Sequence, residues 1–258
     1  MNVKAYILAS LVFSLLAACS HIDESERLIY VKPVAVKRHI LLEDFTGQRC
    51  VNCPKASEEI KRLQDQYGEE NVIAVGIHSG PLGFHTNSKF VGLSTDVGDE
   101  YYNYWALEYQ PVGMIDRGSP IEYTAWNTRV REDLEKNATV DIKVFHDCQE
   151  GRLTVRAEVS GVDGPTEGRL QLWLTEDSVT AFQLMPDGTL NKEYVHQHVF
   201  RAAVNGIWGE NINIGEGETL SSQNHELTIP EEWNSENMYI VAFVYNEQGV
   251  QQVCKSRL

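Results

Sequence analysis

Two cysteines, Cys50 and Cys53, stand where an apolar strand gives way to a helix, and this junction constrains the fold more than any other feature. The apolar run from His39 to Phe45 predicts a buried strand. Pro54 suits the first helical turn, where its missing N–H costs nothing, and Gly68 predicts the helix end. A thiol in front of a helix faces unpaired backbone N–H groups and the positive helix end, both of which stabilise the thiolate. The spacing therefore predicts a redox pair, with Cys50 exposed and reactive and Cys53 covered as the resolving thiol.

The cysteines lie within the segment D-F-T-G-Q-R-C-V-N-C, which has a strand before it, a helix after it and an X-Pro sequence further on. These features resemble the thioredoxin fold. The chain as a whole resembles a family of outer-membrane lipoproteins of Bacteroidetes, whose namesake is described as an adhesin. That resemblance implies a thioredoxin-like α/β domain followed by a C-terminal β-sandwich, in a protein of the outer membrane.

The thioredoxin resemblance also implies roles for two further residues. Asp44 matches the aspartate that in thioredoxins lies beneath the disulfide and accepts a proton from the second thiol; the alternative is a strand-end acid that reaches water. Pro111 matches, by its order along the chain, the cis-proline that packs against the two cysteines. Arg49 departs from the family, which has tryptophan before the first cysteine, and adds positive charge beside the thiolate.

The first residues predict export and a lipid anchor. Lys4 and the apolar run after it are typical of a signal peptide, over residues 1–18, too short to span a membrane as a helix. The sequence Leu16-Ala17-Ala18-Cys19 resembles a bacterial lipobox, which implies that Cys19 carries lipid; the alternative is an ordinary signal peptide with an incidental cysteine. Residues 19–33 then form a polar tether, and the acyl chains make the membrane contact. Either face of the outer membrane is compatible with this anchor.

Charge and motifs exclude several classes of function. The chain carries 22 Lys and Arg against 37 Asp and Glu, a net charge of −15, which argues against nucleic acid and against electrostatic docking on anionic lipid. P-loop, nucleophile-elbow, His-Glu-x-x-His and dinucleotide-binding patterns do not occur in the sequence, so no cofactor is expected.

The number of cysteines suggests a second bridge. Five cysteines, less Cys19, leave four in a compartment that permits disulfides. With Cys50 and Cys53 as a local pair, the remaining two, Cys148 and Cys254, are predicted to form a structural disulfide. Such a bridge would close a loop of about a hundred residues and contribute on the order of 4 kcal/mol in the chain-entropy model. The alternative is two free thiols.

The hydrophobic periodicity divides the chain into two predicted domains. Residues 34–137 end in a helical pattern with Trp126, Val130 and Leu134 at spacings of four, and form the thioredoxin-like domain. From residue 138 the pattern alternates, which predicts an immunoglobulin-like β-sandwich over 138–258. Seven strands are expected, at residues 140–144, 153–157, 170–174, 195–203, 218–229, 238–245 and 250–255.

Two groups of aromatic residues are interpreted as core. The first lies in the segment between the predicted strands of the first domain, where it would otherwise form a lid or ligand platform: Tyr101, Tyr102, Tyr104 and Trp105. The second lies in the second domain, where tryptophan also serves as a sugar-stacking residue: Trp173, Trp208 and Trp233.

Two histidines in the second half are compatible with a metal site. His196 and His198 alternate along a predicted strand, so their imidazoles would share one face. A third ligand is required, and no spacing in the sequence supplies it. An ordinary exposed strand face is therefore the preferred interpretation, and no metal is expected.

Two functions follow from these observations. The first is thiol–disulfide exchange through Cys50 and Cys53, with a protein dithiol or disulfide as substrate. The second is a non-catalytic surface binding or adhesin role, in which the same pair is a structural bridge on a thioredoxin-like scaffold. Half of a zinc site is the weakest reading of the pair, because neither a second C-x-x-C nor clustered histidines accompany it.

Overall fold

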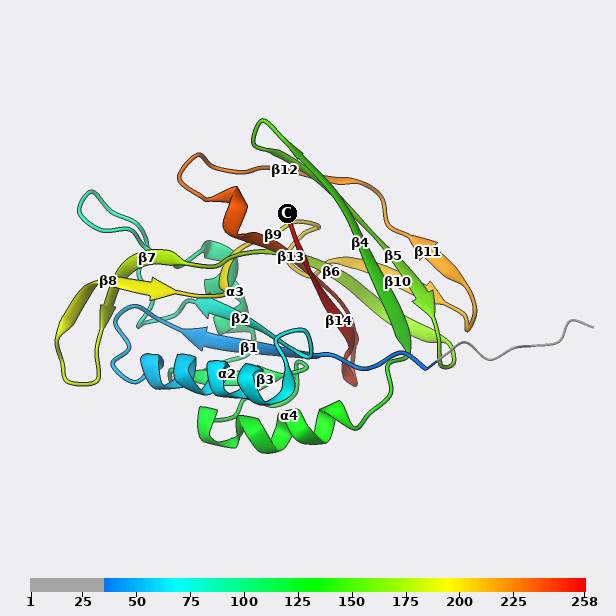
Figure 1. The fold of residues 1–258 in the computed structure, drawn as a ribbon, viewed down its shortest axis with the longest axis horizontal. Helices are drawn as coiled ribbons and strands as arrows, with labels where there is room; N and C mark the ends of the chain where they lie inside the picture. The colour runs from blue at the N-terminus through cyan, green and yellow to red at the C-terminus, as the bar shows by residue number, and fades with distance from the viewer. Residues whose placement is uncertain (1–34) are drawn as a thin grey trace, which may run out of the picture. The chain divides into compact units, whose positions relative to one another are not determined.

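The computed structural model describes residues 35–258, and its first elements are the predicted strand, turn and helix (Figure 1). β1 (Ile40–Thr46) is buried along its whole length, and α2 (Cys53–Tyr67) begins at the second cysteine with Pro54 in its first turn. The helix ends at Gly68, where φ is +97° and the backbone N–H donates to Gln64 O at 2.8 Å. Glycine adopts this conformation without the steric cost that a side chain adds.

The other elements of the first half surround β1. They are β2 (Val72–His78), α3 (Asp96–Tyr104), β3 (Val112–Ile115), a 3-10 turn η2 (Tyr123–Ala125) and α4 (Trp126–Leu134). β2 pairs parallel with β1, with α2 as the crossover, and β3 pairs antiparallel with β1 on its other side. This order places the loop between the two cysteines at the end of a central strand.

The second half consists mainly of strands. They are β4 (Val140–Gln149), β5 (Arg152–Gly161), β6 (Thr166–Glu176), β7 (Val179–Leu184), β8 (Leu190–His196), β9 (Val199–Ala203), β10 (Glu210–Ile214), β11 (Thr219–Ser221), β12 (His225–Thr228), β13 (Met238–Asn246) and β14 (Gly249–Arg257), with a 3-10 turn, η3 (Ser235–Asn237), before β13. Each predicted strand region contains a strand, although two regions are each divided between two strands. β7, most of β8, and β10 were not predicted.

One sheet contains strands from both sides of the predicted boundary between residues 137 and 138. Its path is β14-β13-β6-β9-β2-β1-β3, with β10 paired to β6 as the eighth strand. β9 makes the junction, because it pairs antiparallel with β6 and in parallel with β2 through Val199 and Gly76. A four-stranded sheet of β4, β5, β11 and β12 and the β7–β8 hairpin complete the fold. The protein is a mixed α/β structure rich in strands, which confirms the predicted mixture of α/β and β parts.

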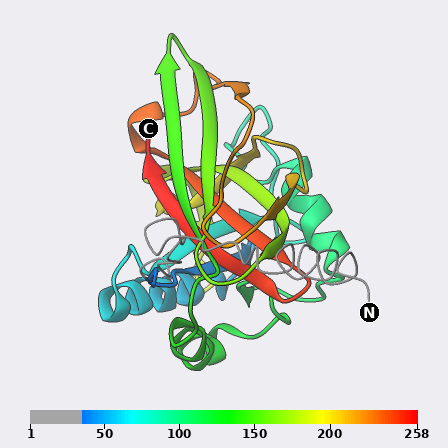
Figure 2. The ribbon, with the colours of Figure 1, turned by 90° about the vertical axis from the view of Figure 1, so that its right-hand side faces the viewer.

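Three apolar clusters hold these layers together. The first lies between helices α2 and α4 and one face of β1 and β2, and includes Trp126. The second, which includes Leu172, lies between the four-stranded sheet and one face of β6 and β13; Figure 2 shows β4 and β5 passing over β13 and β14. The third joins Phe45 of β1 to Trp173 of β6, so the large sheet curls around it. Leu172 and Trp173 enter different clusters because successive strand residues point to opposite faces.

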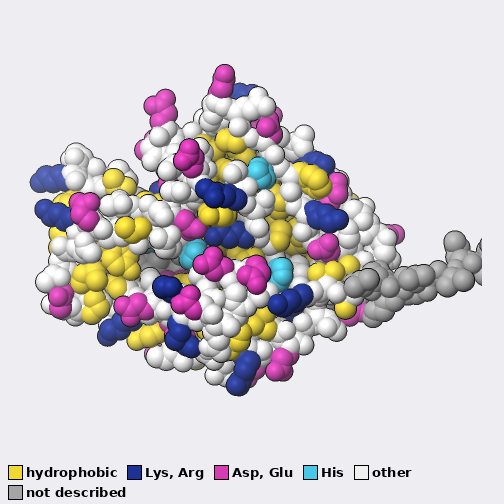
Figure 3. Space-filling model, viewed as in Figure 1, with side chains coloured by type: hydrophobic (Ala, Val, Ile, Leu, Met, Phe, Trp, Pro, Cys, Tyr) yellow, Lys and Arg dark blue, Asp and Glu magenta, His cyan; other side chains and the backbone are white. Residues whose placement is uncertain are grey.

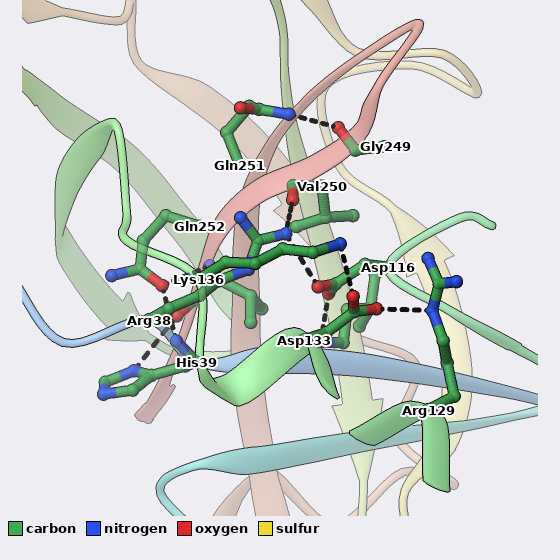
Figure 4. Close-up of polar contacts among 12 residues, drawn as sticks. Arg38, His39, Asp116, Arg129, Asp133, Lys136, Gly249, Val250, Gln251 and Gln252 are labelled. Atoms are coloured by element: carbon green, nitrogen blue, oxygen red, sulfur yellow. Dashed lines mark hydrogen bonds and ion pairs between the residues drawn. The ribbon is translucent and has the colours of Figure 1, made fainter. Parts of the chain in front are cut away.

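A polar network fastens the two ends of the curled sheet to each other (Figure 4). β3 and β14 stand at opposite ends of the strand order, yet Val250 N donates to Asp116 O at 2.9 Å. Arg38 joins both: its Nη2 lies 2.8 Å from Asp116 Oδ2 and also donates to Val250 O. Asp116 Oδ1 accepts the Leu41 N–H at 2.9 Å. Burial raises the Asp116 pKa to about 6, and the Arg38 charge opposes that rise.

No helix within residues 35–258 is long and apolar enough to cross a membrane. On the face drawn in Figure 3, acidic and basic side chains are interspersed, and no basic patch is present on that face. The predicted signal peptide, Cys19 and the tether through residue 33 lie outside the described residues.

Candidate functional site

Cys50 and Cys53 form a disulfide at the junction of β1 and α2. Their Cα atoms are 5.4 Å apart. Cys50 lies in the connecting turn, where its N–H donates to Gly47 O, and Cys53 is the first residue of α2. The structure therefore places the pair at the start of a helix, as the sequence predicted.

The predicted exposure of Cys50 is wrong. Cys50 is 2% exposed and Cys53 is 1% exposed. The β7–β8 hairpin covers the turn: Gln183 Nε2 donates to Cys50 O at 2.9 Å, and Leu184 N donates to Gln48 O at 2.9 Å. The sequence did not indicate this cover, because the hairpin lies more than a hundred residues further along the chain and its strands are short.

The loop between β2 and α3 also covers the turn that carries Cys50. The buried amide of Gln48 donates to Val91 O and to Phe182 O, both at 3.1 Å, and accepts the Leu93 N–H at 2.8 Å. Arg49 was expected to add charge beside the thiolate; its guanidinium lies over the Phe84 ring, 5.1 Å from the centroid. The turn is thus held by the hairpin and the loop together.

Asp44 lies near the end of β1 and is buried. It is 2% exposed, and its Oδ1 has no hydrogen-bond partner. Burial raises its pKa to about 8, so the carboxyl is mostly protonated at neutral pH. Asp44 and Cys53 both line a cavity of about 380 Å³, which α2, β2 and the β7–β8 hairpin enclose. The interpretation of Asp44 as an acid at the surface is therefore wrong, and the structure places Asp44 and Cys53 at the same cavity.

Two buried histidines line the same cavity. His78 ends β2, His196 ends β8, and His78 Nε2 lies 3.3 Å from His196 Nδ1. Burial lowers the pKa of His196 to about 4 and that of His78 well below its usual value, so both rings are neutral at neutral pH. The sequence could not reveal this pair, because 118 residues separate its members.

The shared strand face proposed for His196 and His198 is absent. β8 ends at His196, and His198 has a φ of +57°, which turns the chain. His198 Nδ1 lies 3.0 Å from Asp177 Oδ1. Burial alone would raise the Asp177 pKa, but His198 and Lys255 together lower it. Among residues 35–258, no group of three or more His, Cys, Asp or Glu side chains is arranged to hold a metal ion.

The Gln110–Pro111 peptide is cis, as predicted, and immediately precedes β3. The Gln110 side chain connects this bond to the strands beside it. Its Nε2 donates to Thr46 O at 2.6 Å and to Ser79 O at 2.9 Å, at the ends of β1 and β2. Pro111 is therefore held at the same end of the sheet as the cysteine turn.

The predicted bridge between Cys148 and Cys254 is not formed. Both thiols are free; Cys148 is exposed, and Cys254 packs against the cluster that includes Leu172. Asp141 is close enough to Cys254 to raise its pKa, after the larger effect of burial, and His146 Nε2 lies 3.4 Å from Ser256 Oγ. β4 and β14 therefore run in the same direction, and these two contacts place Cys254 beside residues 141–144, so Cys148 lies about four to seven residues, or roughly 13–23 Å, further along β4. A disulfide spans Cα atoms less than about 7 Å apart.

Comparisons with known proteins place the chain among outer-membrane proteins. The sequence model of the family described as Outer membrane protein Omp28 matches residues 98–258. The structure is similar to HBP35 of Porphyromonas gingivalis, with a TM-score of 0.68 and 16% identity over 88% of this chain and 77% of that chain, which shows a shared fold. A domain of the outer membrane lipoprotein Omp28 from Porphyromonas gingivalis matches with a TM-score of 0.34 and 25% identity, over 47% of this chain and 88% of that chain. No curated protein matches the chain.

Proposed function

The chain belongs to the Omp28 family of outer membrane proteins. We propose that it exchanges thiols and disulfides at the outer membrane through Cys50 and Cys53. One observation carries the proposal: Asp44 is buried and lacks a partner for Oδ1, in a cavity that also reaches Cys53. A buried polar atom without a hydrogen bond destabilises a fold. A disulfide with a purely structural role has no use for such a carboxyl group, whereas a proton donor for the resolving sulfur must lie there.

The proposal includes an architecture and an anchor. We assign residues 34–137 to a thioredoxin-like domain, which the β1–α2–β2 arrangement, the cis peptide before β3 and the disulfide at the start of α2 support. We assign residues 138–258 to an immunoglobulin-like β-sandwich, which the packing of the four-stranded sheet on β6 and β13 supports. Acylation at Cys19 supplies the membrane contact.

The exchange step balances without a cofactor. A substrate thiolate attacks Cys50 Sγ, and the bond between the two cysteines breaks with its electron pair on Cys53 Sγ. Asp44, which is protonated at neutral pH because burial raises its pKa to about 8, donates its proton to that sulfur. A second substrate thiolate then attacks the mixed disulfide and releases Cys50. The protons that the two substrate thiols lose end on Asp44 and on Cys50 Sγ, so two electrons and two protons pass from the substrate dithiol to the protein, and the reverse sequence reduces a substrate disulfide.

The β7–β8 hairpin must move before a substrate reaches Cys50, since the residue is 2% exposed. Gln183→Ala removes the amide that donates to Cys50 O at 2.9 Å and to Gly47 O at 3.3 Å. Hydrogen bonds of this kind contribute about 1 kcal/mol each, so we expect the loss of both to let dithiothreitol reduce the disulfide of the variant about thirtyfold faster than that of the wild type. The exposed Gln223 provides a matched control as Gln223→Ala. Equal rates for all three proteins would show that the hairpin does not limit access.

Replacing the resolving cysteine tests the function itself. In Cys53→Ser the Cys50 thiol is free, and a mixed disulfide with a substrate cannot be resolved. We expect the full-length variant, expressed in its native envelope, to accumulate reducible adducts on a non-reducing gel. The double variant Cys50→Ser/Cys53→Ser should show none. Absence of adducts from both proteins would contradict the proposal.

The burial of both cysteines favours one alternative, a binding protein in which the disulfide is structural. The reduction potential separates the two functions, because structural disulfides have potentials below about −300 mV. A higher value supports exchange. A lower value, together with the absence of adducts, would leave a lipid-anchored binding protein on a thioredoxin-like scaffold.

A further inference from the structure

The β7–β8 hairpin, which covers Cys50, is attached to the rest of the protein both near its tip and at its base. Near the tip it hydrogen-bonds the turn that carries Cys50. At the base, His196 ends β8 and meets His78, which ends β2, and Figure 1 shows these two strand ends side by side. Just beyond His196 the chain is fixed to β2, because Gly76 N donates to His198 O at 2.8 Å. The histidine pair therefore lies at the point about which the hairpin would turn if it lifted.

The two histidine rings are in contact and enclosed. His78 Nε2 lies 3.3 Å from His196 Nδ1, and the rings meet edge to face with their centroids 5.1 Å apart. His78 is 4% exposed and His196 is 5% exposed. The outer nitrogens, His78 Nδ1 and His196 Nε2, are buried without a hydrogen-bond partner. A protonated imidazole carries an N–H on both nitrogens, so a proton added to this pair would leave a buried donor with no acceptor.

Within residues 35–258, the acids near this pair are neutral, paired or exposed to water. The ionisable groups around the pair are Asp44 of β1, Glu58 and Lys61 of α2, Glu69 after α2, Glu176 and Asp177 at the end of β6, Tyr194 of β8, His198 before β9, Arg201 of β9 and Lys255 of β14. Asp44 is protonated at neutral pH because burial raises its pKa to about 8, and Glu58 and Glu69 are exposed. Glu176 is paired with Arg201 at 2.8 Å, and Asp177 is paired with both His198 and Lys255. A positive charge on the pair would therefore have no buried carboxylate to balance it.

The same surroundings decide how readily the two rings bind protons. Burial lowers the pKa of His196 to about 4, although the carbonyl groups of Phe182 and Ala181 oppose the shift. Burial also lowers the His78 pKa well below its usual value, and His196 and Arg201 lower it further. In an open hairpin, where water reaches both rings, the pKa of each would be near 6.5. A base whose pKa is lower in the closed state favours the open state as the pH falls below its open-state pKa, and the effect grows until the closed-state pKa is reached.

We propose that this pair makes the hairpin a pH-sensitive cover, which protects the disulfide at neutral pH and opens in mild acid. Protonation puts positive charge on two buried rings whose nitrogens are 3.3 Å apart, one on the hairpin and one on β2. The charge is relieved when His196 moves away from His78 into water. Reaction partners then reach Cys50 more readily at pH 5 than at pH 7. As regulation of the disulfide, the inference rests on the proposed function.

Reduction of the disulfide in the full-length protein by a water-soluble phosphine tests the proposal, because a phosphine does not depend on a thiolate, which is scarce in acid. Each rate is divided by the rate for a synthetic disulfide peptide of residues 47–55 at the same pH, so that the pH dependence of the reductant cancels. We expect this ratio to rise about twentyfold or more from pH 7 to pH 5, the change that His196 alone gives with pKa values of about 4 when closed and about 6.5 when open.

Two double variants remove the titration from the pair. His78→Phe/His196→Phe retains buried rings, and His78→Gln/His196→Gln retains polar groups that can hydrogen-bond each other. In both, the ratio should change less than about threefold between pH 7 and pH 5. Glu43 and Asp116, with pKa values of about 7 and about 6, titrate in the same range but remain in these variants, so their contribution is separated. The matched control is His225→Gln, on β12 of the four-stranded sheet, which should keep the full rise.

Three results would overturn the proposal: a wild-type ratio that does not change with pH, a double variant that keeps the wild-type rise, or a rise that accompanies loss of the circular dichroism of the whole protein. The adducts of Cys53→Ser test exchange separately. A full pH rise without adducts would refute exchange and leave the cover, whereas adducts with a flat profile would refute the cover alone.

Discussion

Replacing Arg38 with methionine is expected to lower the free energy of unfolding by about 3–5 kcal/mol at pH 8. Arg38 is 7% exposed and forms an ion pair with Asp116, which is 4% exposed, at 2.8 Å. Methionine retains apolar volume but leaves the Asp116 carboxylate buried without its cation. The loss exceeds what the pair itself contributes, because the remaining charge stays buried. Urea denaturation followed by circular dichroism measures the difference.

The deficit of Arg38→Met should shrink as the pH falls. Burial raises the Asp116 pKa from 3.8 to about 6 even with Arg38 beside it, so without Arg38 the carboxyl group binds a proton still more readily. For an acid whose pKa is raised by folding, the penalty is absent below its unfolded pKa and complete above its folded pKa. The variant should therefore lie closer to the wild type at pH 5 than at pH 8.

Two further variants test whether the loss in Arg38→Met comes from the unpaired Asp116 carboxylate. Arg38→Met/Asp116→Asn removes both charges while keeping an acceptor for the Leu41 N–H, and should recover most of the loss. Arg62→Met breaks an exposed ion pair with Glu59 and should change stability little. A loss at Arg38 no larger than that at Arg62 would mean that the polar network does not fasten the ends of the sheet.

Local patterns predicted the parts of the fold that depend on neighbouring residues. The strand before Cys50, the helix from Cys53 and the alternating strands after residue 138 all follow from periodicity within short windows. The shared sheet does not, because it depends on β9 pairing with both β6 and β2 through residues far apart in sequence. The disulfide predicted between Cys148 and Cys254 failed for a similar reason: the count of cysteines carries no information about the direction in which two strands pack.

The candidate site shows the same division. The sequence pattern at the end of β1 and the start of α2 identified Cys50, Cys53 and Asp44 as site candidates. The cis peptide bond at Pro111 was predicted from the position of this proline along the chain. The burial of Cys50 was missed, because it results from Gln183 on a hairpin that enters from the second half. The short alternating pattern of β7 reveals a strand at best, and nothing in it specifies which surface the hairpin covers.

Replacing Asp44 with asparagine is expected to stabilise the protein at pH 7 by about 2–4 kcal/mol. Burial raises the Asp44 pKa from 3.8 to about 8. Below pH 3.8 the carboxyl is protonated in both the folded and the unfolded chain, so it imposes no penalty there. As the pH rises toward 8, ionisation favours the unfolded chain, and at pH 7 the penalty is about 4 kcal/mol, at 1.36 kcal/mol per pKa unit. Asparagine does not titrate, although its buried amide offsets part of the gain through unpaired N–H groups.

Asp44→Asn should also slow the opening of the disulfide between Cys50 and Cys53. Without a proton donor for the Cys53 sulfur, Asp44→Asn should open its disulfide with dithiothreitol at least about tenfold more slowly than the wild type at pH 7. The two rates should converge above pH 8, where Asp44 itself is ionised. The stability gain should disappear near pH 4, and Asp65→Asn, at an exposed position, should change neither property. A variant that is stabilised but exchanges at the wild-type rate would leave Asp44 as a buried acid without a role in exchange, and the proposed function would lose the observation that carries it.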